Sequence, residues 1–202
     1  RVGGQRPRLA FISPLPPERT GIADYSTQVL PAMLAHYEID LVVQQTRVDL
    51  PASLAALPQR SVAWFEQNAM LFDRVLYQFG NSPFHSHMFG LLARHPGVVV
   101  LHDFFLSAVL AYEQMTGVLP DAWTDALYRD HGMAALVAGT DPERALEARG
   151  VYPCNMAVLR DARHVIVHSH HARELARQWY GELAGANWSV VPLPRALPPT
   201  GS

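Results

Sequence analysis

The stretch that decides the fold is Val98-Val99-Val100-Leu101, followed directly by His102-Asp103. Four consecutive apolar residues, three of them β-branched, predict a strand that is buried on both faces, as strands of parallel sheets are. The helix-breaking segment His95-Pro96-Gly97 stands just before it. An imidazole and a carboxylate therefore come where a buried parallel strand ends.

Strand-like and helix-like segments alternate on both sides of this run. The other predicted strands are Arg8–Ser13, Ile39–Val43, Ser61–Phe65, Val75–Phe79, His164–Val167 and Trp188–Val191. Helical spacing of apolar residues predicts helices at 22–37, 84–94, 104–115, 121–138, 142–149, 155–161 and 169–180. Pro31 is expected to kink or break the first of these helices. Residues 50–60 are predicted to form a short helix or a connector. This alternation predicts an α/β, Rossmann-like doubly wound fold, with a mostly parallel sheet and helices on both faces.

Length and composition favour one large domain. The chain has 202 residues, of which 49% are hydrophobic, enough for a sizeable core. We expect the domain at 8–194, after a polar lead-in at 1–7 and before the start of a linker at 195–202. A net charge of -2 without a basic stripe argues against nucleic acid as a partner.

Cysteine content and hydropathy bear on location. The single cysteine, Cys154, cannot form an internal disulfide, which fits a reducing compartment. No run approaches the length of a membrane span, and the N-terminus lacks a signal-peptide pattern. We therefore expect a cytoplasmic location.

Function is sought in the loops that follow strands, because ligands of open α/β sheets bind beyond the carboxyl ends of the strands. Four such loops carry polar residues: Pro14–Gly21, Gly80–His87, His102-Asp103 and His168–His171.

The first loop delivers Thr20-Gly21-Ile22 to the start of a helix, whose N–H groups and dipole favour a phosphate. The alternative is that Gly21 permits a tight turn and Thr20 caps the helix. Asp24 in the first turn would repel phosphate. No G-x-G-x-x-G or Walker pattern occurs, which argues against a dehydrogenase or P-loop protein.

The second and third loops offer groups that suit sugar hydroxyls. His102 can bond a hydroxyl or transfer a proton, and Asn81 and His85 can donate and accept hydrogen bonds. The alternatives are that Asp103 caps the next helix, that His102 is a satisfied core histidine, and that Ser82 and His87 belong to a turn and cap.

The histidines of the fourth loop raise the question of a metal. His168, His170 and His171 have no cysteine nearby and form no H-E-x-x-H pattern, so no metal site is predicted. His170 and His171 fit the exposed first turn of a helix better.

Three motifs together resemble a known family. They are Ser13-Pro14-Leu15-Pro16-Pro17-Glu18-Arg19-Thr20-Gly21-Ile22-Ala23-Asp24-Tyr25, Val100-Leu101-His102-Asp103 and His164-Val165-Ile166-Val167-His168-Ser169. In this order they resemble the N-terminal domain of GT-B glycosyltransferases of family 4, over nearly the whole chain.

The resemblance implies an activity and its partners. A sugar would pass from a nucleotide sugar to an acceptor hydroxyl with retention, without a cofactor or essential metal, the acceptor being a carbohydrate or lipid-linked sugar. Thr20, Gly21 and Ile22 would lie at the donor diphosphate. His102 would be the catalytic residue, orienting a hydroxyl of the donor sugar, and Asn81, His85 and Asp103 would bind the acceptor. Peripheral contact with the inner face of the membrane is left open.

Departures from the family limit what this chain is expected to do. In the family, a glutamate pair and the basic residues that bind the diphosphate belong to a second, C-terminal Rossmann domain. The residues after Pro194 in this sequence could not supply such a domain. We therefore expect this chain alone to be inactive and its own C-terminal domain to be a partner. The loop has one glycine where many relatives have two. The alternative function is a non-catalytic Rossmann-like module that binds a ligand or partner.

Overall fold

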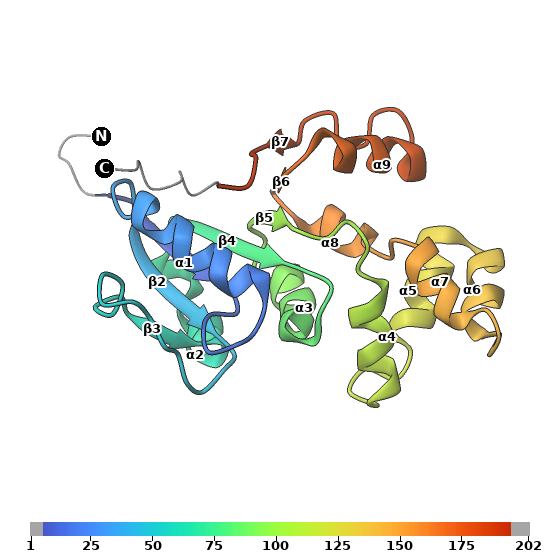
Figure 1. The fold of residues 1–202 in the computed structure, drawn as a ribbon, viewed down its shortest axis with the longest axis horizontal. Coiled ribbons are helices and arrows are strands. Elements are labelled where there is room, and N and C mark those ends of the chain that lie inside the picture. Colours follow the sequence, from blue (N-terminus) through green and yellow to red (C-terminus); the bar gives the residue numbers. More distant parts are fainter. Residues whose placement is uncertain (1–5, 195–202) are drawn as a thin grey trace, which may run out of the picture.

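A seven-stranded parallel sheet organises the computed structural model, which describes residues 6–194 (Figure 1). The strands are β1 (Arg8–Ile12), β2 (Glu38–Val43), β3 (Gln59–Ser61), β4 (Arg74–Phe79), β5 (Val98–Leu101), β6 (His164–Val167) and β7 (Ser189–Val190). Their order is β3-β2-β1-β4-β5-β6-β7, and all six pairings are parallel. The predicted α/β, Rossmann-like fold class is confirmed.

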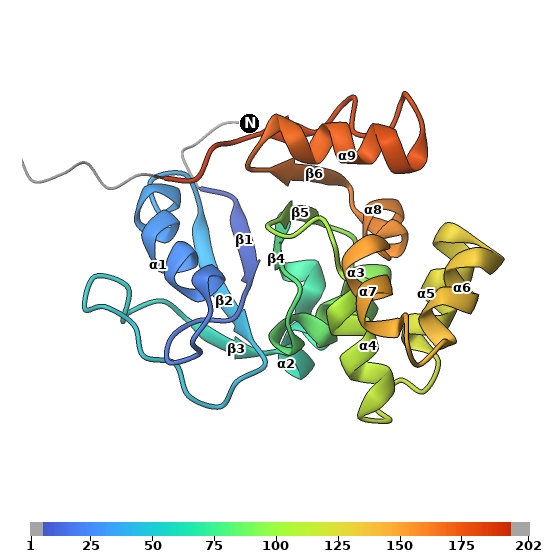
Figure 2. The ribbon, with the colours of Figure 1, turned by 45° about the vertical axis from the view of Figure 1, so that its right-hand side comes forward.

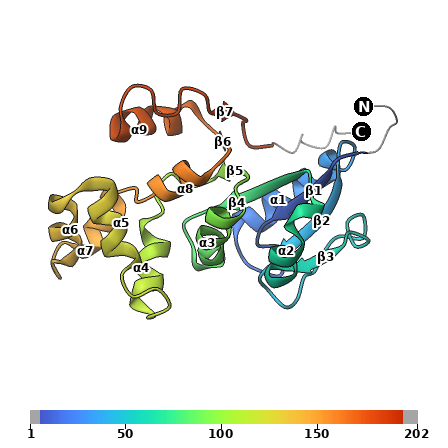
Figure 3. The same ribbon diagram turned by 180° about the vertical axis from the view of Figure 1, so that it is seen from behind.

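Helices cover both faces of this sheet. Helix α1 (Gly21–Met33) lies in front of it in Figure 1, whereas α2 (Val62–Asn68) and α3 (Ser86–Arg94) lie on the opposite face, which Figure 3 shows. Two short 3₁₀ turns, η1 (Ala69–Leu71) and η2 (Pro83–His85), complete these crossovers. This covering on both faces explains why the central strands consist almost wholly of apolar residues.

The alternation of side chains along β1 divides the core into two clusters. Leu9 and Phe11 pack with Leu30 of α1, whereas Ala10 and Ile12 belong to the cluster that contains Phe65 of α2. Successive side chains of a strand point to opposite faces, so one short strand contributes to both clusters. Full burial of each large side chain contributes about 1.5–3 kcal/mol to folding.

A helical insertion separates β5 from β6. It consists of α4 (Ser107–Met115), α5 (Ala122–His131), α6 (Met133–Thr140), α7 (Ala145–Val151) and α8 (Met156–Asp161), and Figure 2 shows α4–α7 beside the sheet. His131 stacks on Tyr180 of α9 (His170–Tyr180) and contacts Trp179 edge-on, which ties the insertion to α9. None of the helices within residues 6–194 is long and apolar enough to span a membrane.

Several predicted boundaries were wrong, each for a local reason. Ser61–Phe65 is not a strand: β3 ends at Ser61, whose Oγ caps α2 by accepting from Trp64 N at 3.1 Å. The predicted 121–138 helix is broken at Gly132, which has φ 81. Helix α1 continues through Pro31 but ends at Met33, short of the predicted end at residue 37. Residues 50–60 form no helix, so the alternative prediction of a connector applies there.

The terminal segments are described only in part. The predicted domain range of 8–194 contains all the helices and strands of the described residues. Most of the predicted lead-in, residues 1–5, and the whole predicted linker start, 195–202, lie outside the described residues.

Two glycines allow a matched test of the packing. A Cβ on Gly97 would stand 2.6 Å from Val75 O, a backbone atom of the neighbouring strand, whereas a Cβ on Gly150 of α7 would meet nothing within 4 Å. We expect Gly97→Ala to lower the free energy of unfolding by more than about 1 kcal/mol through this overpacking. Gly150→Ala should raise it by up to about 1 kcal/mol, because alanine favours the helix. Urea denaturation measures both, and equal effects would contradict the packing described for Gly97.

Candidate functional site

The strand order reverses between β1 and β4, since the chain leaves β1 toward β2 and leaves β4 toward β5. At such a switch point the loops diverge and leave a crevice beyond the carboxyl ends of the strands. A pocket of about 330 Å³ lies there. It is lined by Arg19, Thr20, Gly21, Ile22, Asn81, Ser82, Phe84, His85, His102 and Asp103, which include every site residue predicted from the sequence. We call it the switch-point pocket.

The wall formed by α1 presents fewer free amides than the sequence suggests. Thr20 Oγ1 accepts from Ile22 N at 3.0 Å, and Thr20 O accepts from the amides of Ala23 and Asp24. Gly21 N–H is the first-turn amide for which no acceptor is found among the described residues. Anion binding here would therefore use this amide, the helix dipole and the exposed guanidinium of Arg19.

Gly21 is required neither by backbone conformation nor by packing. Its φ lies outside the left-handed region, and a Cβ added to it would meet no atom of residues 6–194 within 4 Å. The tight-turn explanation of this glycine is therefore not supported. The predicted capping role of Thr20 is confirmed by its bond to Ile22 N.

The wall that follows β4 is fixed by two side chains predicted to bind an acceptor. Asp103 Oδ2 accepts from Asn81 N at 2.8 Å, and Asn81 Oδ1 accepts from Val109 N in the first turn of α4 at 3.0 Å. Gly80 lets α1 approach closely, since a Cβ there would collide with Ile22 Cδ1. Asn81 and Asp103 thus hold loops together, which leaves the Asn81 amide nitrogen and the other Asp103 oxygen for any ligand.

His102 belongs to a chain of hydrogen bonds. Its Nε2 lies 2.8 Å from Gln78 Oε1, and its Nδ1 lies 3.2 Å from His168 Nε2. His168 Nδ1 in turn donates to Val191 O at 2.8 Å. Two neutral imidazoles satisfy all three contacts if Gln78 presents its NH₂ group to His102. Both ring nitrogens of His102 are engaged, so it contacts a ligand through its ring unless one of these bonds opens.

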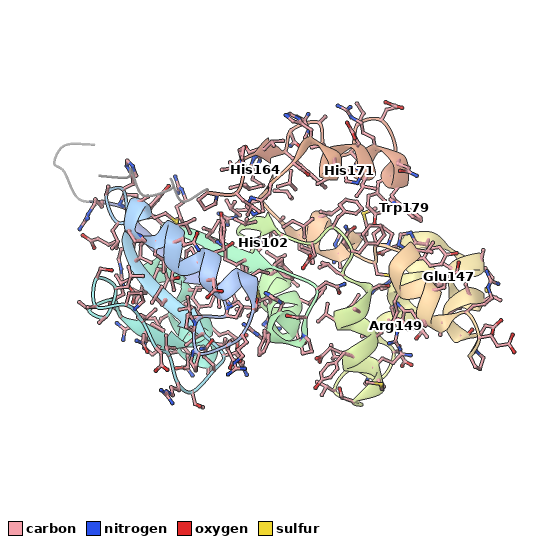
Figure 4. All side chains as sticks on the ribbon, in the orientation of Figure 1. His102, Glu147, Arg149, His164, His171 and Trp179 are labelled. Atoms are coloured by element: carbon pink, nitrogen blue, oxygen red, sulfur yellow. The ribbon has the colours of Figure 1, made fainter. Side chains whose placement is uncertain are left out.

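The position of His102 in the molecule is central. Figure 4 shows it between the sheet and the helical insertion, away from His171 on α9 and from Glu147 on α7. The Tyr25 ring packs edge-on against it at 4.7 Å between centroids. Burial, followed by the nearby imidazoles of His168 and His85, lowers the pKa of His102 to about 3. His102 is therefore neutral at pH 7.

His85 is the most buried of the predicted site residues, at 1% exposed. Its Nδ1 lies 3.0 Å from Ser82 Oγ and 3.2 Å from Ser82 O, and its Nε2 has no hydrogen-bond partner among the described residues. Burial lowers its pKa to about 4, outweighing the Ser82 carbonyl and the Asp103 carboxylate, which both raise it. When Nδ1–H donates to Ser82 O, Nε2 is left as a buried, unused acceptor beside the switch-point pocket.

The remaining histidines divide between two places. His168 joins the site through His102, whereas His170 and His171 are exposed on α9, where His171 Nδ1 lies 3.6 Å from Glu174 Oε2. Within residues 6–194 no three histidine, cysteine or carboxylate side chains come together as metal ligands.

Three contributors to the site were missed from the sequence. Arg19 supplies the cation of the α1 wall, Gln78 pairs with His102, and Tyr25 packs on it. A glutamine in the otherwise apolar run Val75–Phe79 was a signal for the second of these, since buried polar side chains need a partner.

Comparisons of the chain with protein-family models, curated proteins and solved structures find no match.

Acid should destabilise the fold through the buried histidines. The pKa values of His85, His87 and His102 lie below the ordinary value of 6.5, so the unfolded chain binds more protons than the folded chain as the pH falls. The free energy of unfolding should keep its full value above about pH 6.5 and fall as the pH drops toward 4. Protonation of His85 alone should lower it by about 3 kcal/mol over this range. NMR titration of the imidazole protons and urea unfolding at several pH values test this. A His85 resonance that titrates near 6.5 would contradict it.

Proposed function

We propose that this chain is the N-terminal, acceptor-side domain of a retaining GT-B glycosyltransferase of family 4. In this proposal the switch-point pocket receives the diphosphate and sugar of a nucleotide-sugar donor. The observation that carries the proposal is the meeting of the α1 N-terminus, Arg19, His85 and His102 around one pocket at the point where strand order reverses. Anion-binding and hydroxyl-binding groups thus adjoin there, as a sugar diphosphate requires.

The anionic part of the donor would bind at α1. Gly21 N–H and the dipole of a 13-residue helix favour a phosphate oxygen, and the space beside Gly21 lets the phosphate approach the backbone closely. The Arg19 guanidinium adds a full positive charge in a planar geometry that suits phosphate. Asp24, also in the first turn, opposes this binding.

The sugar part would bind at the two histidines. Neutral His85 and the His102 ring line the part of the pocket that would receive the sugar, and the buried His85 Nε2 would accept from a hydroxyl once the pocket wall adjusts to admit it. With its nitrogens held by Gln78 and His168, His102 acts in this proposal by positioning the donor sugar rather than as a nucleophile. Transfer itself would also require the second domain that the family resemblance implies.

Calorimetric titration with UDP and GDP tests the proposal. At least one should bind, and Arg19→Gln should weaken it about tenfold at low salt because a charge-assisted hydrogen bond is lost. Gly21→Val should weaken binding by filling the space beside the amide, without loss of thermal stability. Arg177→Gln, on the exposed surface of α9, is the matched control and should change nothing.

Two outcomes decide against the proposal. Failure of both nucleotides to bind, or binding that Arg19→Gln and Gly21→Val leave unchanged, would remove the donor site. Nucleotide binding by a full-length protein that transfers no sugar from any of a panel of nucleotide sugars would favour the non-catalytic binding module.

A further inference from the structure

A second and larger pocket adjoins the switch-point pocket. It has a volume of about 530 Å³ and shares Phe84 with its neighbour. Its walls come from the loops after β1 and β2, from the start of α3, and from the end of α4 with the turn that follows. This volume lies within the range of small-molecule sites. We call it the α4 pocket.

Glu113 of α4 is the notable group in this pocket. The residue is 5% exposed and lines the pocket, yet no hydrogen bond or ion pair to its carboxylate is found within residues 6–194. The Glu113 backbone is tied to the turn that follows α4, because its backbone oxygen accepts from Thr116 Oγ1, Val118 N and Leu119 N. A carboxylate that lines a pocket and has no partner within residues 6–194 is available to a ligand group that can complete it.

The charged residues that line the α4 pocket favour a cationic ligand. Glu18 adds a second carboxylate to the lining, and no arginine or lysine lies among the described lining residues. Glu113 also stands in the last turn of α4, where the helix dipole already disfavours negative charge. Burial lowers the pKa of His87 to about 4, so its imidazole brings no positive charge at pH 7.

The start of α3 adds polar groups to the lining of the pocket. Within residues 6–194, Ser86 Oγ and His87 Nε2 are buried without hydrogen-bond partners, and α3 begins at Ser86 without a side-chain cap. Phe84, which is 39% exposed, supplies an apolar surface between the two pockets. A ligand for the α4 pocket therefore combines several hydroxyls, an apolar C–H face and one cationic group.

We propose that the α4 pocket is the acceptor subsite and that it selects an amino sugar, whose protonated amine binds the Glu113 carboxylate. The assignment of the pocket as an acceptor subsite rests on the proposed function, whereas its selectivity for an amine rests on Glu113 and its surroundings. Within residues 6–194, no three metal-ligating side chains come together, so the two carboxylates of this pocket fit an ammonium group, which donates three hydrogen bonds, better than a metal ion.

The test is an NMR titration of the chain at pH 6.5 with glucosamine, glucose and N-acetylglucosamine. Glucosamine should bind at least about tenfold more tightly than glucose, through a charge-assisted hydrogen bond at a buried site. N-acetylglucosamine, which has no charged amine, should gain nothing over glucose. The amide signals of Val118 and Leu119 should shift, which locates the binding.

Variants identify the responsible group. Glu113→Gln should reduce the preference for glucosamine to less than about twofold, whereas Glu143→Gln, at an exposed position in the insertion, should leave it intact. Equal binding of the three sugars, no binding of any, or a preference that survives Glu113→Gln would overturn the proposal. The preference is measured on the unmodified chain, so it can fail even if Glu113→Gln does not fold.

The two proposals fail separately. UDP or GDP binding at the switch-point pocket without a preference for glucosamine would overturn the amino-sugar inference and leave the glycosyltransferase proposal standing. A preference for glucosamine that depends on Glu113, in a chain that binds neither nucleotide, would support the amine pocket and overturn the proposed function.

Discussion

The reversal of strand order between β1 and β4 is the constraint on which the rest of the structure depends. The backbone hydrogen bonds of a parallel sheet hold β1 and β4 side by side, while their crossovers depart in opposite directions. The loops after these strands therefore cannot close over one another. Gly80 lets the start of α1 approach the β4 loop, and Asn81 fixes that loop to α4. The switch-point pocket and the α4 pocket both follow from this divergence.

Most of the fold could be predicted because its signals are local. The run Val98–Leu101 and the alternation of strands with periodic helices are typical of a parallel sheet, and the structure has one. The strand predicted at Ser61–Phe65 is wrong because a short apolar run fits a strand or a helix equally well. Here the Ser61 side chain caps α2, which stabilises the helix. Strand order could not be read from the sequence, since it depends on which strands pair across long separations.

The site was predictable by position but not by bonding. All the predicted residues line one pocket because loops after parallel strands gather at one edge. Their hydrogen bonds were hidden, since the partners of His102 are Gln78 on the neighbouring β4 and His168 after β6. Glu113 was missed for a related reason: nothing in its sequence surroundings shows that the end of α4 folds back against the loops after β1 and β4.

The insertion between β5 and β6 also has a consequence for how the chain folds. Strand β6 pairs with β5 across the intervening residues 102–163, whereas β1 to β5 are joined by shorter crossovers. Closing a longer loop costs more chain entropy before any pairing contact is gained. The five strands β1 to β5 can therefore assemble as an early unit, with β6, α9 and β7 docking last. His168 belongs to that later unit, so we expect the bond network around His102 to be completed after β1 to β5 have paired.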